Sequence, residues 1–246
     1  MLSIEDFRSS FEELTNDFDW EVEGFLDKKN RVHPIDLDTK VISTVFERFA
    51  SPVIRSIAIP LDYEVETANQ TTYPDFTLSG PNNHRIGLDI KTTYVRNSML
   101  FTLGGYNSFL RNNTKNILYP YNTYSEHWIL AFIYEQLPPF AEYDLKNFPA
   151  RGEVPCPYKV KAVFIRHKHE ITGLRAGSGN TKNIGSVKFN SPNDFSEVQG
   201  PFCFFENPKE ACDHYWKSYE SYKDVVFNKE DLLMHPEFKR FGPIFS

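Results

Sequence analysis

The chain begins and ends with stretches of helical periodicity. Ser3 followed by Asp6 is typical of a capped helix start, and apolar residues then recur every three or four positions as far as Phe18. Residues 207–222 show the same spacing with an aromatic face. We therefore predict an amphipathic helix near each end of the chain.

Another helix is predicted to begin after Asp38 and Thr39. Its apolar stripe continues beyond Pro52, where we expect the helix to be disturbed because proline cannot donate a backbone hydrogen bond. Glu47 lies roughly 200° around this helix from Val45, at ~100° per residue. On periodicity alone, we therefore expect the Glu47 carboxylate to be exposed to solvent.

Short apolar and alternating runs between these helices predict β-strands. Four of them are separated by turn-forming clusters and favour an antiparallel meander: residues 63–67, 73–78, 86–94 and 99–103. Residues 160–166 predict another strand, whereas residues 128–134 fit a strand or a buried helix equally well. The pattern does not predict the secondary structure of residues 109–116.

Composition places the chain among soluble globular proteins of one domain. It has 246 residues, 40% of them hydrophobic and 15% aromatic, which excludes a disordered chain. No apolar run approaches the ~18–20 residues of a membrane span, and the acidic N-terminus is unlike a signal peptide. We expect a cytoplasmic protein without a membrane partner. Its three cysteines lack CxxC spacing and indicate neither a disulfide framework nor a zinc site.

The net charge of −6 is unevenly distributed along the chain. Residues 1–30 hold nine acidic and three basic residues, which accounts for the whole imbalance. Residues 91–122 contain four basic residues and no acidic one, and residues 159–188 contain seven basic residues and only Glu170. Two central segments are thus locally cationic. Either a surface that binds a polyanion or an ordinary solvated surface explains this distribution of charge.

One predicted hairpin concentrates charged groups on a single face. If paired residue numbers sum to 164, Asp75 lies opposite Asp89. Lys91 leaves the same face as Asp89 because the two are two residues apart, whereas Leu88 and Ile90 point to the opposite face, into the core. Two carboxylates and a lysine therefore share one surface.

Opposed carboxylates are destabilising unless a cation neutralises them, and a hard divalent ion such as Mg²⁺ suits oxygen ligands. Such a metal can activate water and polarise a phosphoryl oxygen, while a lysine orients the water or balances charge. This predicts hydrolysis of a phosphodiester. The alternative is structural: Asp75 closes a turn after Pro74, and Lys91 forms a salt bridge with Asp89.

The pattern Pro74-Asp75 … Asp89-Ile90-Lys91 resembles the PD-(D/E)xK nuclease superfamily. Its surroundings resemble the EcoRV family of type II restriction endonucleases in the strings DTKVISTVFERF, YPDFTLSG, DIKTTY, FTLGGYNSFLRNNTKNILYP and AGSGNTKNIGS. The resemblance covers most of the chain and is weak in the first 30 residues, from Pro138 to Pro155, and from Asn190 onward.

The resemblance implies roles for residues of the candidate site. Asp75 and Asp89 match metal-binding aspartates, and Lys91 matches the catalytic lysine. Glu47 matches a helix glutamate that supplements the metal site, so the resemblance favours a functional role over a solvated carboxylate. Lys40, on the same helix, is a further candidate for this site. The number of metal ions stays open.

The resemblance also implies a DNA recognition loop at residues 177–183, where a surface turn is the ordinary interpretation. The expected base readers are Gly177, Gly179, Asn180 and Thr181, supported by Ser178 and Asn183. An asparagine is suited to a bidentate contact with adenine. Lys182 replaces a threonine of the family loop and could reach a phosphate.

Further DNA contacts are implied outside this loop. Asn69 and Gln70 match a second loop that approaches the minor groove. Candidates for phosphate or sugar contacts, each of which could equally be ordinary surface residues, are Thr39, Thr93, Tyr94, Arg111, Asn112 and Lys115.

The expected fold is α/β, with a mixed, twisted central sheet flanked by helices in one domain, residues 1–246. Regions of about 1–35 and 138–158 are expected to form a small dimerisation part. The implied protein is a homodimer that uses Mg²⁺ to cut both strands of double-stranded DNA, leaving 5′-phosphate and 3′-hydroxyl ends. GATATC with blunt cutting is the expected target, helped by bending at the central TA step, and the host would need a cognate DNA methyltransferase.

Two alternatives remain at this point. Another PD-(D/E)xK nuclease of different specificity, or a DNA repair nuclease, would keep the chemistry and change the target. A DNA-binding module without activity would need a defective triad, but all three residues are present.

Overall fold

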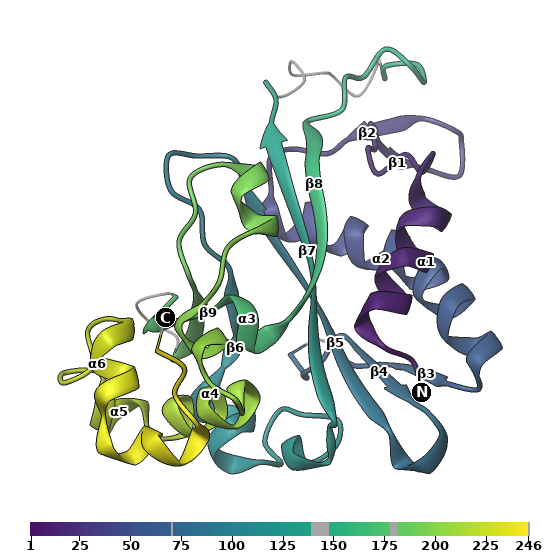
Figure 1. Cartoon of the computed structure of the whole chain (residues 1–246). Helices are drawn as coiled ribbons and strands as arrows, with labels where there is room; N and C mark the ends of the chain where they lie inside the picture. Colours follow the sequence, from purple (N-terminus) through teal and green to yellow (C-terminus); the bar gives the residue numbers. More distant parts are fainter. Residues whose placement is uncertain (70, 139–147, 178–181, 246) are drawn as a thin grey trace.

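The computed structural model describes residues 1–69, 71–138, 148–177 and 182–245, and it is built around a five-stranded sheet (Figure 1). The strand order is β3-β4-β5-β7-β8, with β5 and β7 parallel and the other neighbours antiparallel. The strands are β3 (Glu64–Thr67), β4 (Phe76–Ser79), β5 (Arg85–Tyr94), β7 (Glu126–Gln136) and β8 (Tyr158–His167). The predicted mixed α/β architecture is thereby confirmed.

The β4–β5 hairpin has the predicted register. Phe76 pairs with Leu88, and Leu78 pairs with Ile86, so both pairs sum to 164. Leu88 and Ile90 are buried in the core. The alternation of side chains along a strand therefore predicted correctly which residues of β5 point into the core.

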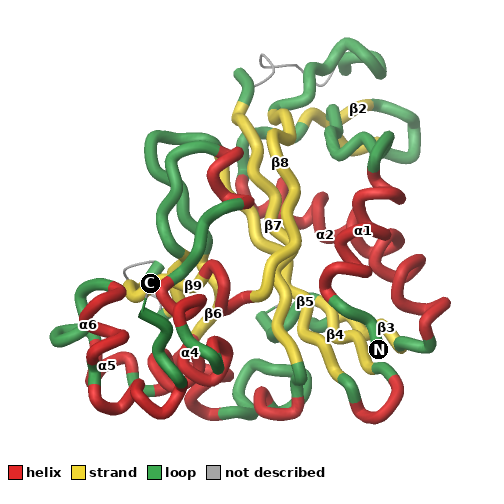
Figure 2. The backbone as a smooth tube through the Cα atoms, viewed as in Figure 1, coloured by secondary structure: helices red, strands yellow, loops and turns green. Residues whose placement is uncertain are grey.

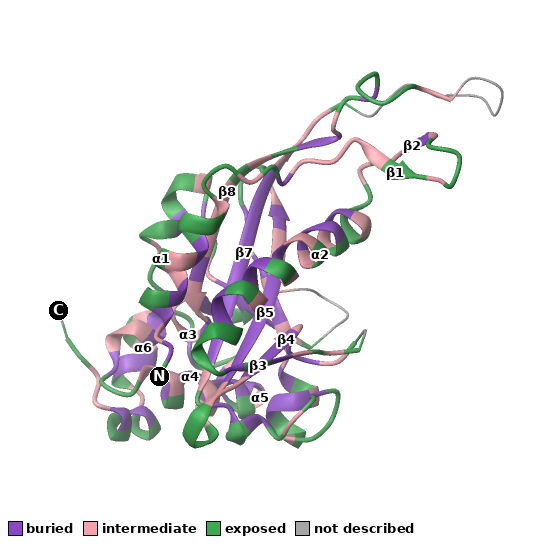
Figure 3. Ribbon diagram, turned by 90° about the vertical axis from the view of Figure 1, so that its right-hand side faces the viewer, coloured by how far each residue is buried: buried purple, intermediate pink, exposed green. Residues whose placement is uncertain are grey.

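Residues 128–134, which fitted a strand or a helix, belong to the interior strand β7, between β5 and β8. Every residue from Trp128 to Tyr134 is buried, because β7 is covered on both faces (Figure 3). Its side chains alternate between two cores: Trp128 and Phe132 belong to one, and Ile129 and Ile133 to the other. A strand buried on both sides has no polar face, so its sequence lacks the usual alternation.

One face of the sheet is covered by α1 (Ile4–Thr15) and α2 (Thr39–Ala58) (Figures 1 and 2). Ser3 caps α1 by accepting a hydrogen bond from the backbone N–H of Asp6 at 3.1 Å, as predicted. Asp38 caps α2, which runs through Pro52 without ending. Buried residues on both sides of Pro52, among them Ala50 and Ile54, hold the two halves of α2 against the core.

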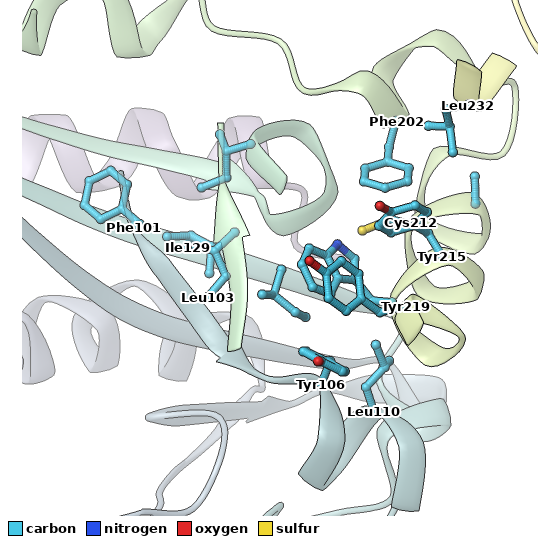
Figure 4. Packing of buried hydrophobic residues seen from close by; sticks show 14 of the residues in the cluster. Phe101, Leu103, Tyr106, Leu110, Ile129, Phe202, Cys212, Tyr215, Tyr219 and Leu232 are labelled. Atoms are coloured by element: carbon cyan, nitrogen blue, oxygen red, sulfur yellow. The ribbon is translucent and has the colours of Figure 1, made fainter. Parts of the chain in front are cut away.

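The opposite face carries a second, three-stranded sheet with the order β6-β10-β9. Its strands are β6 (Thr102–Gly105), β9 (Thr172–Ala176) and β10 (Asn183–Ser186), and its helices are α3 (Lys168–Ile171), α4 (Pro208–Lys217), α5 (Tyr219–Tyr222) and α6 (Lys229–Met234). The aromatic face of α4 and α5 packs into this core (Figure 4).

The predicted four-stranded meander is therefore wrong in its last strand. Residues 99–103 do not pair with β5: Met99 bridges to Phe189, and β6 pairs with β10. The reason is that β5 already has β4 on one edge and β7 on the other. The chain must leave the first sheet before it can form another strand.

A two-stranded hairpin, β1 (Gly24–Leu26) and β2 (Val32–Pro34), stands at one end of the molecule (Figure 1). It lies beside residues 148–157, since Arg31 stacks on the ring of Phe148 and the backbone N–H of Gly152 donates to Glu23. The remaining short helical turns are η1 (Ile59–Leu61), η2 (Pro81–Asn83), η3 (Tyr106–Leu110), η4 (Tyr121–Thr123), η5 (Pro192–Ser196), η6 (Pro201–Phe204) and η7 (Pro236–Phe241). Within the described parts of the chain, no helix combines the length and the apolar character needed to cross a membrane.

Candidate active site

The three charged residues of the hairpin come together where β4 and β5 begin to separate. Asp75 Oδ2 accepts a hydrogen bond of 2.6 Å from the backbone N–H of Ile90, which places its carboxylate beside that of Asp89. Lys91 Nζ lies 2.5 Å from Asp89 Oδ2 and donates to the Ile90 carbonyl oxygen at 3.0 Å. The predicted grouping of two carboxylates and a lysine is present.

Burial makes this grouping electrostatically costly. The Asp89 side chain is only 4% exposed. Desolvation, followed by the neighbouring charge of Asp89, raises the pKa of Asp75 to about 8. Burial alone would lower the pKa of Lys91, but the charges of Asp89, Asp75 and Glu47 outweigh it and raise the pKa. The lysine therefore keeps its proton, and the site favours an added positive charge.

Glu47 is not a freely solvated carboxylate. It lies on α2, half-buried, in the wall of the cavity that also contains Asp75 and Lys91. Burial raises its pKa, and the charge of Lys91 opposes that rise. Helical periodicity placed Glu47 off the apolar stripe of α2 correctly, but that side of the helix faces the candidate site.

The oxygen atoms at this point fit a hard divalent cation. Asp75 and Asp89 supply carboxylate oxygens, and Ile90 supplies a carbonyl oxygen, a donor set suited to Mg²⁺ or Ca²⁺. Asp89 Oδ2 is buried and has no hydrogen bond of normal geometry despite its ion pair with Lys91. Among the described residues, no three acidic, histidine or cysteine side chains form a ready-made metal cluster. A cation here would therefore need further ligands from backbone, water or substrate.

Asp75, Glu47 and Lys91 line a cavity of about 590 Å³ between α2, β5 and the start of the second sheet. Several predicted residues line it: Thr39, Lys40, Glu47, Asp75, Lys91, Thr93, Tyr94 and Gly177. The sequence interpretation missed Arg96, which also lines the cavity and stacks 5.1 Å from the ring centre of Tyr94. Its position in the acid-free segment 91–122 was the available signal.

A second cavity of about 380 Å³ lies on the other side of Asp75 and Glu47. Asn69 and Thr71 line it, together with Arg48. Asn69 of the predicted second loop therefore reaches the neighbourhood of the carboxylates, while Gln70 lies outside the described residues.

Most of the predicted recognition loop, namely Ser178, Gly179, Asn180 and Thr181, lies outside the described residues. Its two ends are held together by a hydrogen bond of 3.1 Å from Gly177 N to Asn183 O. Gly177 is packed so closely that a Cβ atom would lie 3.1 Å from Gly185 Cα. Lys182 is exposed, and its Nζ lies 3.6 Å from Glu220 Oε1. The loop thus leaves from the wall of the first cavity.

Three other predicted DNA contacts lie apart from the carboxylates. Arg111, Asn112 and Lys115 are exposed and do not line either cavity around Asp75. Arg111 donates hydrogen bonds to the Lys217 carbonyl oxygen and to Asn107. Their role in binding DNA stays a prediction.

Comparison with known proteins agrees with this architecture. Residues 16–241 match the family described as "Restriction endonuclease EcoRV". The chain is also 44% identical over 209 residues to the type II restriction enzyme EcoRV of Escherichia coli, a match that covers 82% of this chain and 83% of that enzyme. A family match over most of the chain, joined to a hairpin that carries Asp75, Asp89 and Lys91 on one face, shows that this protein belongs to the EcoRV family of type II restriction endonucleases.

Proposed function

We propose that this endonuclease hydrolyses both strands of double-stranded DNA with Mg²⁺ as cofactor, leaving 5′-phosphate and 3′-hydroxyl ends. The observation that carries the proposal is the paired Asp75 and Asp89 carboxylates, buried beside Lys91 at the edge of an open cavity. Such a pair has excess negative charge and suits a divalent ion.

Asp75, Asp89 and the Ile90 carbonyl oxygen are the proposed metal ligands. When bound, Mg²⁺ supplies Lewis-acid activation of water and of the scissile phosphate. Lys91 keeps its proton because its pKa is raised. It therefore acts as a donor toward a phosphate oxygen and stabilises the charge that develops there, instead of taking up a proton.

Glu47 is proposed to supplement the metal site from the opposite wall of the cavity. Its half-buried carboxylate interacts electrostatically with Lys91 and Asp89. Lys40 and Thr39, about two turns earlier on α2, line the same cavity and are placed to contact the DNA backbone.

The target proposed for the enzyme is GATATC, cut to blunt ends. The loop of residues 177–183 is the proposed major-groove reader, with Asn180 on adenine, because its sequence closely resembles the family loop. Asn69 and Gln70 are proposed to act on the minor groove. The cavity residues Thr93 and Tyr94, and the exposed Arg111, Asn112 and Lys115, are proposed backbone contacts.

A homodimer is the proposed assembly, because a palindromic site matches a protein with two-fold symmetry. The β1–β2 hairpin and the adjoining residues 148–157 are the proposed dimerisation part. Phe25 and Leu26 support this assignment, since both are more than half exposed. We also propose that a cognate DNA methyltransferase protects the DNA of the host from cleavage.

The test is digestion of a long, fully sequenced DNA duplex by the purified protein with Mg²⁺, followed by sequencing of both strand ends. Blunt ends confined to GATATC are expected, with no cutting in EDTA. Specific cutting at another sequence would contradict the proposed target and support the proposed nuclease activity. Cutting only at damaged or branched sites would indicate a DNA repair nuclease. Binding without any cutting would contradict the enzymatic proposal.

A further inference from the structure

Both ends of the recognition loop contact one segment near the C-terminus, residues 215–223, which runs from the end of α4 through α5. We call residues 215–223 the supporting segment. Its tyrosines Tyr215 and Tyr219 pack into the second core (Figure 4). The hydroxyl of Tyr215 nevertheless reaches β9, where it donates to the Leu174 carbonyl oxygen at 2.9 Å. The supporting segment therefore connects the second core to the strand that leads into the loop.

Two further hydrogen bonds connect the supporting segment to the last residues of β9. The hydroxyl of Tyr219 accepts a hydrogen bond of 3.3 Å from the backbone N–H of Ala176. Arg175 donates to the carbonyl oxygen of Lys223 at 2.5 Å. Consecutive residues of β9 are thus bonded to the supporting segment directly before the loop begins at Gly177.

The other end of the loop is connected to the same segment through Lys182. Its ammonium group lies 3.6 Å from Glu220 Oε1, and its carbonyl oxygen accepts a hydrogen bond of 3.1 Å from the backbone N–H of Tyr106. The hydroxyl of Tyr106 donates to Glu220 at 3.3 Å. The exposed ion pair contributes little by itself. Together with the two bonds of Tyr106, however, it holds this end of the loop beside α5.

The ring of Tyr219 is fixed more firmly than the other groups. It is only 8% exposed, stacks on Trp216 with 4.6 Å between ring centres, and meets the ring of Tyr106 edge-on at 5.1 Å. A ring packed on two sides places its hydroxyl oxygen at one point relative to the core. The backbone N–H of Ala176, which donates to that oxygen, is therefore positioned by the core.

We propose that Tyr219 is a positioning residue for base recognition, which fixes the start of the recognition loop through the backbone of Ala176. This inference rests on the proposed function of residues 177–183 as base readers. A loop whose ends are fixed before DNA arrives loses less conformational entropy on binding, so more of its contact energy appears as affinity for the cognate site. Nonspecific binding depends on phosphate contacts and does not gain from this effect.

Amide hydrogen exchange tests the contact itself. Tyr219→Phe removes the hydroxyl and keeps the stacked ring. Tyr222→Phe is the matched control, because Tyr222 is a buried tyrosine of the same helix whose hydroxyl contacts His214 and Glu237 instead of β9. Exchange over residues 172–177 should be roughly threefold to tenfold faster in Tyr219→Phe than in the wild type and the control. Equal exchange in all three proteins would overturn the proposal.

Equilibrium binding in Ca²⁺ tests the effect on recognition, using a cognate duplex and an unrelated duplex of equal length. Tyr219→Phe should weaken cognate binding roughly threefold to tenfold, as expected for one lost hydrogen bond, and should change binding to the unrelated duplex less than twofold. Tyr222→Phe should change neither. Equal weakening on both duplexes would indicate a general loss of structure and would overturn the positioning role, as would unchanged cognate binding.

The wild-type protein separates this inference from the proposed function. The cognate duplex carries whichever sequence the wild type is found to cut, so a target other than GATATC leaves the test intact. A wild-type protein that neither cuts nor distinguishes any sequence would contradict the proposed function, and the positioning role with it. A failure of the inference alone appears only in Tyr219→Phe, with wild-type recognition intact.

Discussion

Lys91 shows how neighbouring charges set the role of a single residue. Its ammonium group is held between the Asp89 carboxylate and the Ile90 carbonyl oxygen, and its raised pKa keeps it charged. Burial, followed by the charges of Asp89 and Glu47, raises the pKa of Asp75, and this group of carboxylates makes the site attractive to a divalent ion. Charge balance thus links the lysine to the proposed metal ligands.

Lys91→Ala should reduce the rate of DNA cleavage by at least about a thousandfold, because it removes the proposed donor to the reacting phosphate. Binding of a cognate duplex in Ca²⁺ should change less than threefold. Single-turnover cleavage and equilibrium binding measure the two effects separately. Lys239→Ala serves as the control, and full activity of Lys91→Ala would exclude the lysine from the chemistry.

Asn180→Ala should weaken discrimination at the adenine that it is proposed to read by ~1–3 kcal/mol, because a bidentate contact is lost. The measurement is the ratio of cleavage rates for the cognate site and for sites with one substituted base pair. Loss of discrimination should be confined to one position of each half-site. An unchanged ratio would remove Asn180 from base recognition.

At the scale of elements, α2 connects the core to the candidate site. Phe46 is fully buried and stacks on Phe132 of β7 with 4.5 Å between ring centres, while the next residue, Glu47, faces the cavity. Packing on one side of the helix therefore fixes a functional side chain on the other.

Phe46→Ala should lower the free energy of unfolding by about 3–5 kcal/mol, since it opens a cavity in the core. Chemical denaturation measures this loss. Phe245→Ala, at a position that is 65% exposed, should change stability by less than about 0.5 kcal/mol. Equal effects of the two variants would contradict the packing of α2 against β7.

The strands show where local sequence was sufficient. The β4–β5 register followed from one short turn and from alternation, whereas no local pattern indicated that residues 99–103 would leave the first sheet. That outcome depends on the parallel pairing of β5 with β7, which joins segments about forty residues apart. Pairing between distant segments depends on which edges are free, a property that no local window contains.

At the scale of the whole molecule, the second core creates buried titratable groups. His169 lies beside His167, and burial followed by the charge of His167 lowers its pKa to about 4 from an ordinary value of 6.5. The unfolded chain therefore binds more protons than the folded chain between these two values.

The stability contributed by neutral His169 should be complete above pH 6.5 and should be lost as the pH falls toward 4, by up to about 3 kcal/mol at roughly 1.4 kcal/mol per unit. His169→Gln should flatten the dependence of unfolding free energy on pH in this window. Denaturation curves at constant chloride concentration measure the slope. Parallel curves for the two proteins would contradict the assigned burial.

The amino-acid sequence was enough to predict the hairpin register, the shared face of Asp75, Asp89 and Lys91, the capped first helix and the family. These depend on residues close in the chain, or on motifs whose spacing carries the chemistry. The packing of distant segments against one another is what brings Glu47 and Arg96 to one cavity and buries Lys168. Burial and charge pairing arise where distant segments meet, because desolvation depends on every group packed around a side chain and not on its neighbours in sequence.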